Sequence, residues 1–137
     1  MDYAILIPDD CINFYLDGFR RATYPDFFRR YCQATRDVFA EIARRDPQVC
    51  ARELTDWLDD HPGRFFRGRR LADRQMLMLQ YTVPAALEMG QEAFARELSR
   101  VWGERHPGCA FRVGTYEELY KGFNNTVLGF KLPGTDA

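Results

Sequence analysis

An arginine-rich stretch at residues 64–74, RFFRGRRLADR, holds the residue types best suited to recognising an anion. It combines five guanidinium groups with two aromatic rings and a glycine, and a predicted helix begins just after it. Arginines bind carboxylates and phosphates through paired N–H donors, helix N-termini favour anions, and exposed aromatic rings stack on bases. The candidate binding residues of this stretch are Arg64, Phe65, Phe66, Arg67, Arg69, Arg70 and Arg74.

A second basic cluster surrounds the start of the strongest predicted helix, and from it Arg29 and Arg30 join the candidate binding residues. If both clusters share one exposed face, the chain has a surface for nucleic acid or a phosphate ligand. In the alternative, Phe65 and Phe66 fill the core and the arginines of residues 64–74 pair with acidic residues. Those acidic residues are Asp56, Asp59 and Asp60.

The two histidines, His61 and His106, each precede a Pro-Gly pair at a predicted helix C-terminus. An imidazole at this position can bind the backbone carbonyls that the helix leaves unpaired. Structural capping is therefore the favoured interpretation. An acid–base pair of His61 with Asp59 or Asp60 is an alternative that rests on no specific spacing.

Four cysteines stand at wide, unequal intervals and form no C-x-x-C pair, which is typical of small buried hydrophobic residues. The sequence contains no nucleotide-binding, P-loop, metalloprotease or serine-hydrolase motif. It therefore predicts no catalytic residue, no cofactor and no metal site. An enzyme with a helical pocket built around one histidine stays as an alternative.

Apolar spacing predicts a mainly α-helical chain of five or six helices. The predicted helices cover residues 9–22, 26–45, 47–60, 71–89, 91–105 and 116–123, and Pro84 is expected to kink or split the fourth. Short strands are predicted at residues 3–7, 110–113 and 126–132. These segments from the two ends of the chain are expected to form a small β-sheet beside the helices.

Two similar phrases, RELTDWLDDHPGRFF and RELSRVWGERHPGCAF, suggest an internal duplication. Their Arg-Glu-Leu triplets lie 44 residues apart (52 to 96) and their His-Pro-Gly triplets 45 (61 to 106). Aligned on Arg-Glu-Leu, the tryptophan changes place between two apolar positions, as a packing residue does. Because a long apolar helix precedes each phrase, the chain is predicted to form two packed α-hairpins. Chance similarity between two helix ends is the alternative.

A single compact domain covering residues 1–137 is expected, because 46% hydrophobic residues can form a core. The net charge of −1 provides no overall attraction to nucleic acid. No apolar run is long enough to cross a bilayer, so no membrane association and a cytoplasmic location are expected. The sequence favours a non-catalytic interaction or regulatory module whose partner is an unknown protein or a second copy of the chain. Nucleic-acid or phosphate binding is the less favoured alternative.

Overall fold

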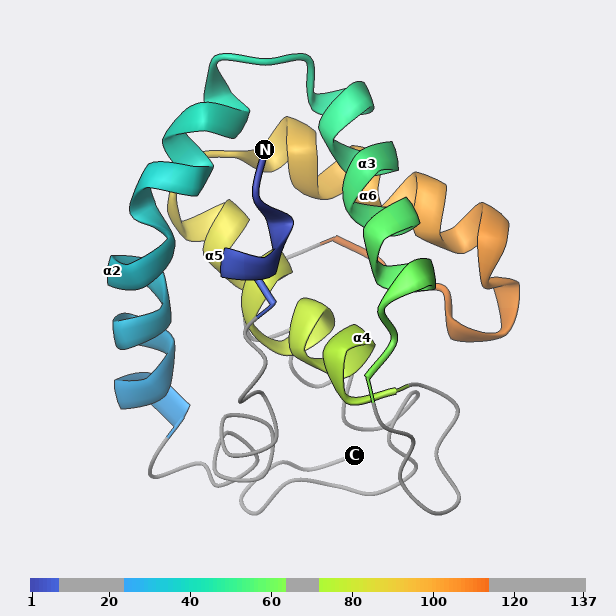
Figure 1. Ribbon diagram of the computed structural model, residues 1–137, viewed down its shortest axis with the longest axis horizontal. Coiled ribbons are helices and arrows are strands. Elements are labelled where there is room, and N and C mark those ends of the chain that lie inside the picture. Colours follow the sequence, from blue (N-terminus) through green and yellow to red (C-terminus); the bar gives the residue numbers. More distant parts are fainter. Residues whose placement is uncertain (8–23, 64–71, 114–137) are drawn as a thin grey trace.

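The computed structural model describes residues 1–7, 24–63 and 72–113, and these residues are mainly helical (Figure 1). A 3-10 turn, Tyr3–Ile5, precedes the helices α2 (Tyr24–Ala43) and α3 (Pro47–Asp60). Next come α4 (Asp73–Leu77), a π-helical turn (Met78–Thr82) and α5 (Val83–Glu88). The last elements are α6 (Glu92–Arg105) and a second 3-10 turn, Pro107–Cys109.

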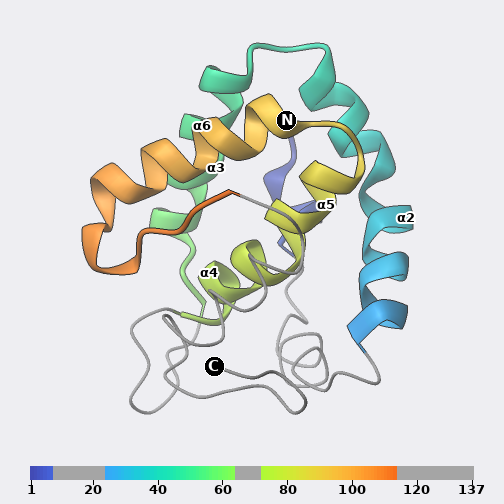
Figure 2. The same cartoon turned by 180° about the vertical axis from the view of Figure 1, so that it is seen from behind.

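A helical segment buried on every side occupies the centre of the molecule. Each side chain from residue 75 to residue 86 is buried, which is expected of a helix that other elements surround. In Figures 1 and 2, α2 lies on one side of this segment and α3 on the other. The remaining helices therefore pack around α4, the π-helical turn and α5.

Pro84 explains why this central segment is divided. Proline donates no backbone hydrogen bond, and its ring collides with the carbonyl four residues earlier in a regular α-helix. Just before it, the Val83 N–H bonds to the carbonyl of Met78, five residues back, which is the π-helical spacing. The predicted interruption of the helix at Pro84 is confirmed.

Local sequence also explains where α3 begins and where α5 ends. The Asp46 carboxylate accepts a hydrogen bond from the Gln48 N–H, and Pro47 occupies the first position of α3. Gly90 has φ +74°, a backbone conformation that favours glycine, and allows the chain to turn from α5 into α6.

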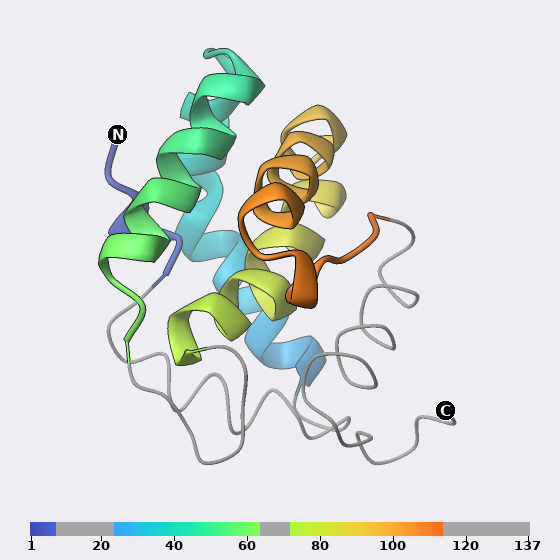
Figure 3. The same ribbon diagram turned by 90° about the vertical axis from the view of Figure 1, so that its right-hand side faces the viewer.

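The helices α3 and α6 pack against each other more extensively than any other pair of separate helices (Figure 3). Both contain 14 residues, and their bounds are offset by 45 (47 to 92 and 60 to 105). Their buried residues are instead offset by 44, for example Leu54 to Leu98 and Leu58 to Trp102. Relative to its ends, α6 is thus rotated by one residue about its axis compared with α3. The prediction of two packed hairpins differs from the structure because α3 packs mainly on α6 and only marginally on α2.

The predicted β-sheet is wrong, because the described residues contain no strand. Residues 3–5 form a 3-10 turn, and the Asp2 carboxylate caps it by accepting a hydrogen bond from the Ala4 N–H. Residues 110–113 form no strand either. A short apolar run does not by itself distinguish a strand from a buried turn. The predicted elements at 9–22, 116–123 and 126–132 lie outside the described residues.

A candidate binding pocket on α2

Of the nine predicted binding residues, three lie in the described part of the chain: Arg29, Arg30 and Arg74. Arg29 and Arg30 on α2 pair with one carboxylate, that of Asp26, and the Arg29 Nη2 to Asp26 Oδ1 distance is 2.6 Å. Arg30 also lies over the Phe27 ring, 5.2 Å from its centroid. The other six, Arg64, Phe65, Phe66, Arg67, Arg69 and Arg70, lie outside the described residues.

Arg74 contacts residues at the end of α3, away from Arg29 and Arg30. Its guanidinium carbon lies 5.4 Å from the centroid of the Trp57 ring, and its Nη1 donates to the His61 carbonyl at 3.4 Å. It therefore packs against the end of α3, across the central segment from α2 (Figure 1). The three described candidates do not form one basic face.

The two histidines both end a helix, as predicted, and each ring contacts the tryptophan four residues earlier, stacked for His61 and tilted for His106. The ring centroids are 4.6 Å apart for His61 and Trp57, and 4.3 Å apart for His106 and Trp102. The His61 Nδ1 donates to the Trp57 carbonyl at 3.0 Å, whereas the His106 Nε2 donates to Asp59 Oδ1 on α3 at 2.9 Å. His61 is thus a local cap, and His106 links α6 to α3.

Two of the three acidic residues that the sequence pairs with residues 64–74, Asp56 and Asp59, contact Arg105 in the structure. The Arg105 Nη1 lies 2.5 Å from Asp56 Oδ1 and 3.2 Å from Asp59 Oδ2. These hydrogen bonds raise the pKa of the Arg105 guanidinium further above its usual value. These ion pairs between Arg105 on α6 and two aspartates of α3 therefore stabilise the packing of α3 on α6.

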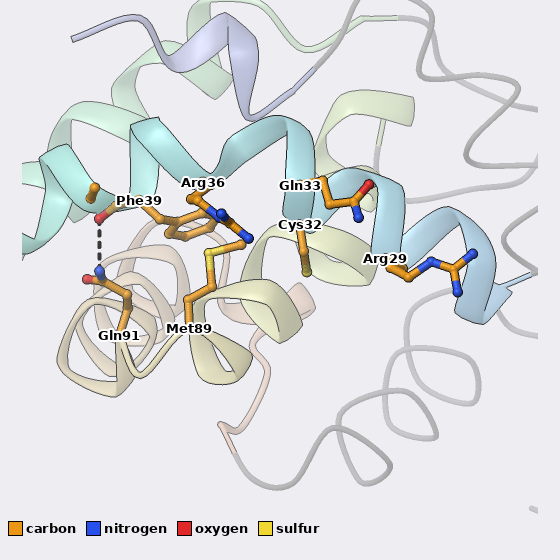
Figure 4. A pocket seen from close by; sticks show the side chains of 8 residues that line it. Arg29, Cys32, Gln33, Arg36, Phe39, Met89 and Gln91 are labelled. Atoms are coloured by element: carbon orange, nitrogen blue, oxygen red, sulfur yellow. Dashed lines mark hydrogen bonds between the residues drawn. The ribbon is translucent and has the colours of Figure 1, made fainter.

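A pocket of about 460 Å³ opens between α2 and the turn that joins α5 to α6 (Figure 4). We call it the α2 pocket, and its lining residues are Arg29, Cys32, Gln33, Arg36, Phe39, Ala40, Met89 and Gln91. The first six recur at helical spacing, so they share one face of α2. Met89 and Gln91 face them from the α5–α6 turn (Figure 4).

A hydrogen bond from Gln91 holds the two walls of the pocket together. The Gln91 Nε2 donates to the Phe39 carbonyl at 2.8 Å, across 52 positions of sequence. The Phe39 side chain is buried, and the half-buried Cys32 and Met89 add sulfur-containing apolar surface beside it. The bottom of the pocket is apolar, and its open side carries the exposed side chains of Arg29, Gln33 and Arg36.

Among the described residues that line the pocket, the charged ones are Arg29 and Arg36, and none carries a carboxylate. Glu88 lies outside the lining but close enough to Cys32 to raise the pKa of its thiol. Arg29 is paired with Asp26, but Arg36 makes no ion pair or hydrogen bond with any residue in ranges 1–7, 24–63 and 72–113. With respect to these residues, the Arg36 donors are available for an external carboxylate or phosphate.

The Cys32 thiol is not poised for nucleophilic chemistry. Burial, together with the nearby negative charge of Glu88, raises its pKa to about 11. At neutral pH the sulfur is therefore protonated, whereas a nucleophilic cysteine needs the thiolate. Neither histidine lines the pocket.

In the described part of the chain, no group of three or more His, Cys, Asp or Glu side chains could hold a metal ion. No helix among these residues is both long and apolar enough to span a bilayer.

Comparison with known proteins adds no relative, because no protein family, curated protein or solved structure matches this chain. The function must therefore be inferred from the geometry of the described residues.

Sequence reasoning named one pocket residue, Arg29, and missed the others. The overlooked residues include Arg36, Phe39, Met89 and Gln91. Arg36 stands alone in the sequence, so clustering did not reveal it. Its position seven residues after Arg29, with Cys32, Gln33, Phe39 and Ala40 on the same helical face, is the pattern that could have indicated it.

Proposed function

We propose that this protein is a small interaction module without catalytic activity, and that a segment of a partner protein binds in the α2 pocket. The observation that carries the proposal is the pocket itself, which has an apolar bottom and a positively charged open side. Its volume lies within the range of sites that hold compact ligands or side chains. Hydrophobic contacts would supply affinity there, and the arginines would supply orientation and specificity.

The rest of the described surface supports recognition through a pocket. Among the described residues, the large hydrophobic side chains that are exposed are Met1, Ile5 and Val49, and each exposes less than half of its surface. A broad apolar interface would need a larger contiguous patch. We further propose a cytoplasmic location, which the free thiols of Cys32 and Cys50 support.

Filling the pocket tests this proposal. Ala40 is an exposed alanine that lines the pocket, so Ala40→Trp places an indole in it. Ala34 is also an exposed alanine of α2 but does not line the pocket, which makes Ala34→Trp a matched control. Tagged wild-type and variant proteins are used to capture partners from a host lysate, with and without nuclease. We expect Ala40→Trp to lose a protein that the wild type and Ala34→Trp retain.

The same capture experiment includes an Arg67/Arg69/Arg70→Glu variant. If the wild type retains nucleic acid that this variant loses, the arginine-rich stretch is the binding surface and the alternative replaces our proposal. If Ala40→Trp retains every partner of the wild type, the α2 pocket is not the docking site. A captured protein that proves to be a second copy of the chain identifies the partner as the protein itself.

A further inference from the structure

We propose that the segment bound in the α2 pocket is acidic and extended, with one apolar side chain between two carboxylates. This inference rests on the proposed function and specifies the chemistry of the partner. It follows from the charge, the apolar bottom and the length of the pocket.

The positive charges of Arg29 and Arg36 favour carboxylates in the bound segment. Arg29 and Arg36 are seven residues apart on α2, so their Cα atoms are separated by about 10 Å along the helix axis. Arg36 has no ion-pair partner among the described residues, and none of the described lining residues is acidic. A partner carboxylate can therefore bind Arg36 without displacing an ion pair to a described residue, and a second one can share Arg29 with Asp26.

The apolar bottom of the pocket favours an apolar side chain between the two carboxylates of the bound segment. Cys32 lies between Arg29 and Arg36 on the same helical face, Phe39 follows Arg36, and Met89 faces that end of the pocket from the α5–α6 turn (Figure 4). Met89 has a flexible, polarisable side chain that adapts to the shape of what it contacts. An aromatic or aliphatic anchor placed here would contact these apolar groups and leave both arginines available to its neighbours.

The length of the pocket suits an extended chain. The lining residues on α2 run from Arg29 to Ala40, which corresponds to about 16 Å of helix. About five extended residues cover this length. In an extended chain, alternate side chains point the same way, so carboxylates four residues apart and an anchor midway between them all face α2. The exposed Gln33 amide, which has no hydrogen bond within the described residues, can bind the backbone of such a segment.

A synthetic probe tests the inference directly. The probe is a fluorescein-labelled peptide whose core is glutamate, serine, phenylalanine, serine and glutamate, and binding is followed by fluorescence anisotropy. One control peptide has lysine in place of both glutamates, and another has serine in place of the phenylalanine. We expect the acidic peptide to bind the wild-type protein more weakly as salt is added, and both control peptides to bind at least about fivefold more weakly.

Charge reversal locates the binding site on the protein. Arg36→Glu should weaken binding of the acidic peptide by about fivefold or more and should improve binding of the lysine peptide. Arg52→Glu is the matched control, because Arg52 is exposed in the middle of α3 and makes no ion pair with any described residue. It should change binding of either peptide by less than about twofold. Bound acidic peptide should also slow alkylation of Cys32, which lines the pocket.

Each other outcome has a distinct meaning. If the serine control peptide binds as well as the acidic peptide, the arginines attract anions without an apolar anchor and the inference is wrong. If the acidic peptide fails to bind while Ala40→Trp still loses a captured partner, the pocket binds a segment of different chemistry. The inference then fails and the proposed function stands. If Ala40→Trp loses no partner and the peptide does not bind, both are wrong.

Discussion

Cys32 shows how the environment of one residue decides its chemistry in the α2 pocket. The thiol lies at the surface of α2, where an unperturbed cysteine would be partly ionised at mildly alkaline pH. Burial and the charge of Glu88 raise its pKa to about 11. The folded protein therefore holds a neutral thiol, which acts as an apolar part of the pocket lining.

The raised pKa of Cys32 predicts a specific pH dependence of its alkylation. Because the thiolate is the reacting form, the rate in the folded protein should rise about tenfold for each pH unit from about 7 to 10. In the urea-unfolded chain the rate should level off above the usual cysteine pKa of roughly 8.5. Peptide mass spectrometry after iodoacetamide treatment separates Cys32 from the other cysteines. A plateau below pH 9 in the folded protein would contradict the described burial of this thiol.

The sign of the effect on stability follows from the same shift. A thiol whose pKa is higher in the folded state contributes stability that is complete below its unfolded pKa. That contribution is lost as pH rises from roughly 8.5 toward about 11. Replacing Cys32 with alanine should remove this pH-dependent part of the unfolding free energy in that window, which urea titrations at several pH values would measure.

At the scale of elements, the two similar helices α3 and α6 end in the same way at their C-termini and differ in the face that they bury. The backbone N–H of His61 bonds to the Trp57 carbonyl, and that of His106 bonds to the Trp102 carbonyl. Yet Trp102 is fully buried, whereas Trp57 is half-buried and contacts Arg74. A rotation of one residue about the helix axis, close to 100°, accounts for the difference.

This difference predicts unequal roles for the two histidines. His106 bonds to Asp59 on α3, so a double-mutant cycle between His106→Ala and Asp59→Asn should give a coupling of about 0.5 kcal/mol. The same cycle with His61→Ala serves as the control and should give no measurable coupling, because His61 bonds within its own helix. Urea unfolding of the wild type, the two single variants and the double variant gives the four free energies of each cycle. Equal coupling of Asp59 to both histidines would show that the contact between α3 and α6 is not as described.

For the whole molecule, the sequence could predict features that depend on neighbouring residues, but not features that depend on contacts between distant residues. Proline, glycine and aspartate act on their immediate neighbours, so the start of α3 at Asp46-Pro47 and the interruption before Pro84 could be predicted. The first residues were mistaken for a strand because the burial of Tyr3 and Leu6 depends on tertiary contacts.

The α2 pocket could not be predicted from the sequence for the same reason, because it depends on a tertiary contact. It requires Phe39 and Gln91, which are 52 positions apart, to meet through one hydrogen bond. No short motif encodes such a contact, and the arginine that makes the pocket cationic, Arg36, stands outside both basic clusters. Sequence reasoning could name the helix that carries the pocket and one arginine on its open side, but not the opposite wall.

A buried hydroxyl network joins three distant parts of the chain. The Tyr31 hydroxyl on α2 donates to the Leu6 carbonyl at 2.8 Å and lies 2.8 Å from Thr82 Oγ1 in the π-helical turn. Tyr31 is buried, and burial raises the pKa of its phenol far above the usual value, so the proton stays in place. The network therefore fixes the N-terminal segment and α2 on the central segment.

Removing the Tyr31 hydroxyl should lower the stability of the whole described fold. Tyr31→Phe keeps the ring beside Tyr81, with centroids 5.6 Å apart, but leaves the buried Leu6 carbonyl with a single longer contact, to Thr82 Oγ1 at 3.5 Å. We expect the free energy of unfolding in urea to fall by about 1–3 kcal/mol. Thr82→Ser, which retains a hydroxyl, is the control and should cost less. Because Tyr31 joins three segments, unfolding should stay a single cooperative transition. Its urea midpoint should move to a lower concentration for every spectroscopic probe. A loss confined to the N-terminal segment would show that this segment folds independently of the central one.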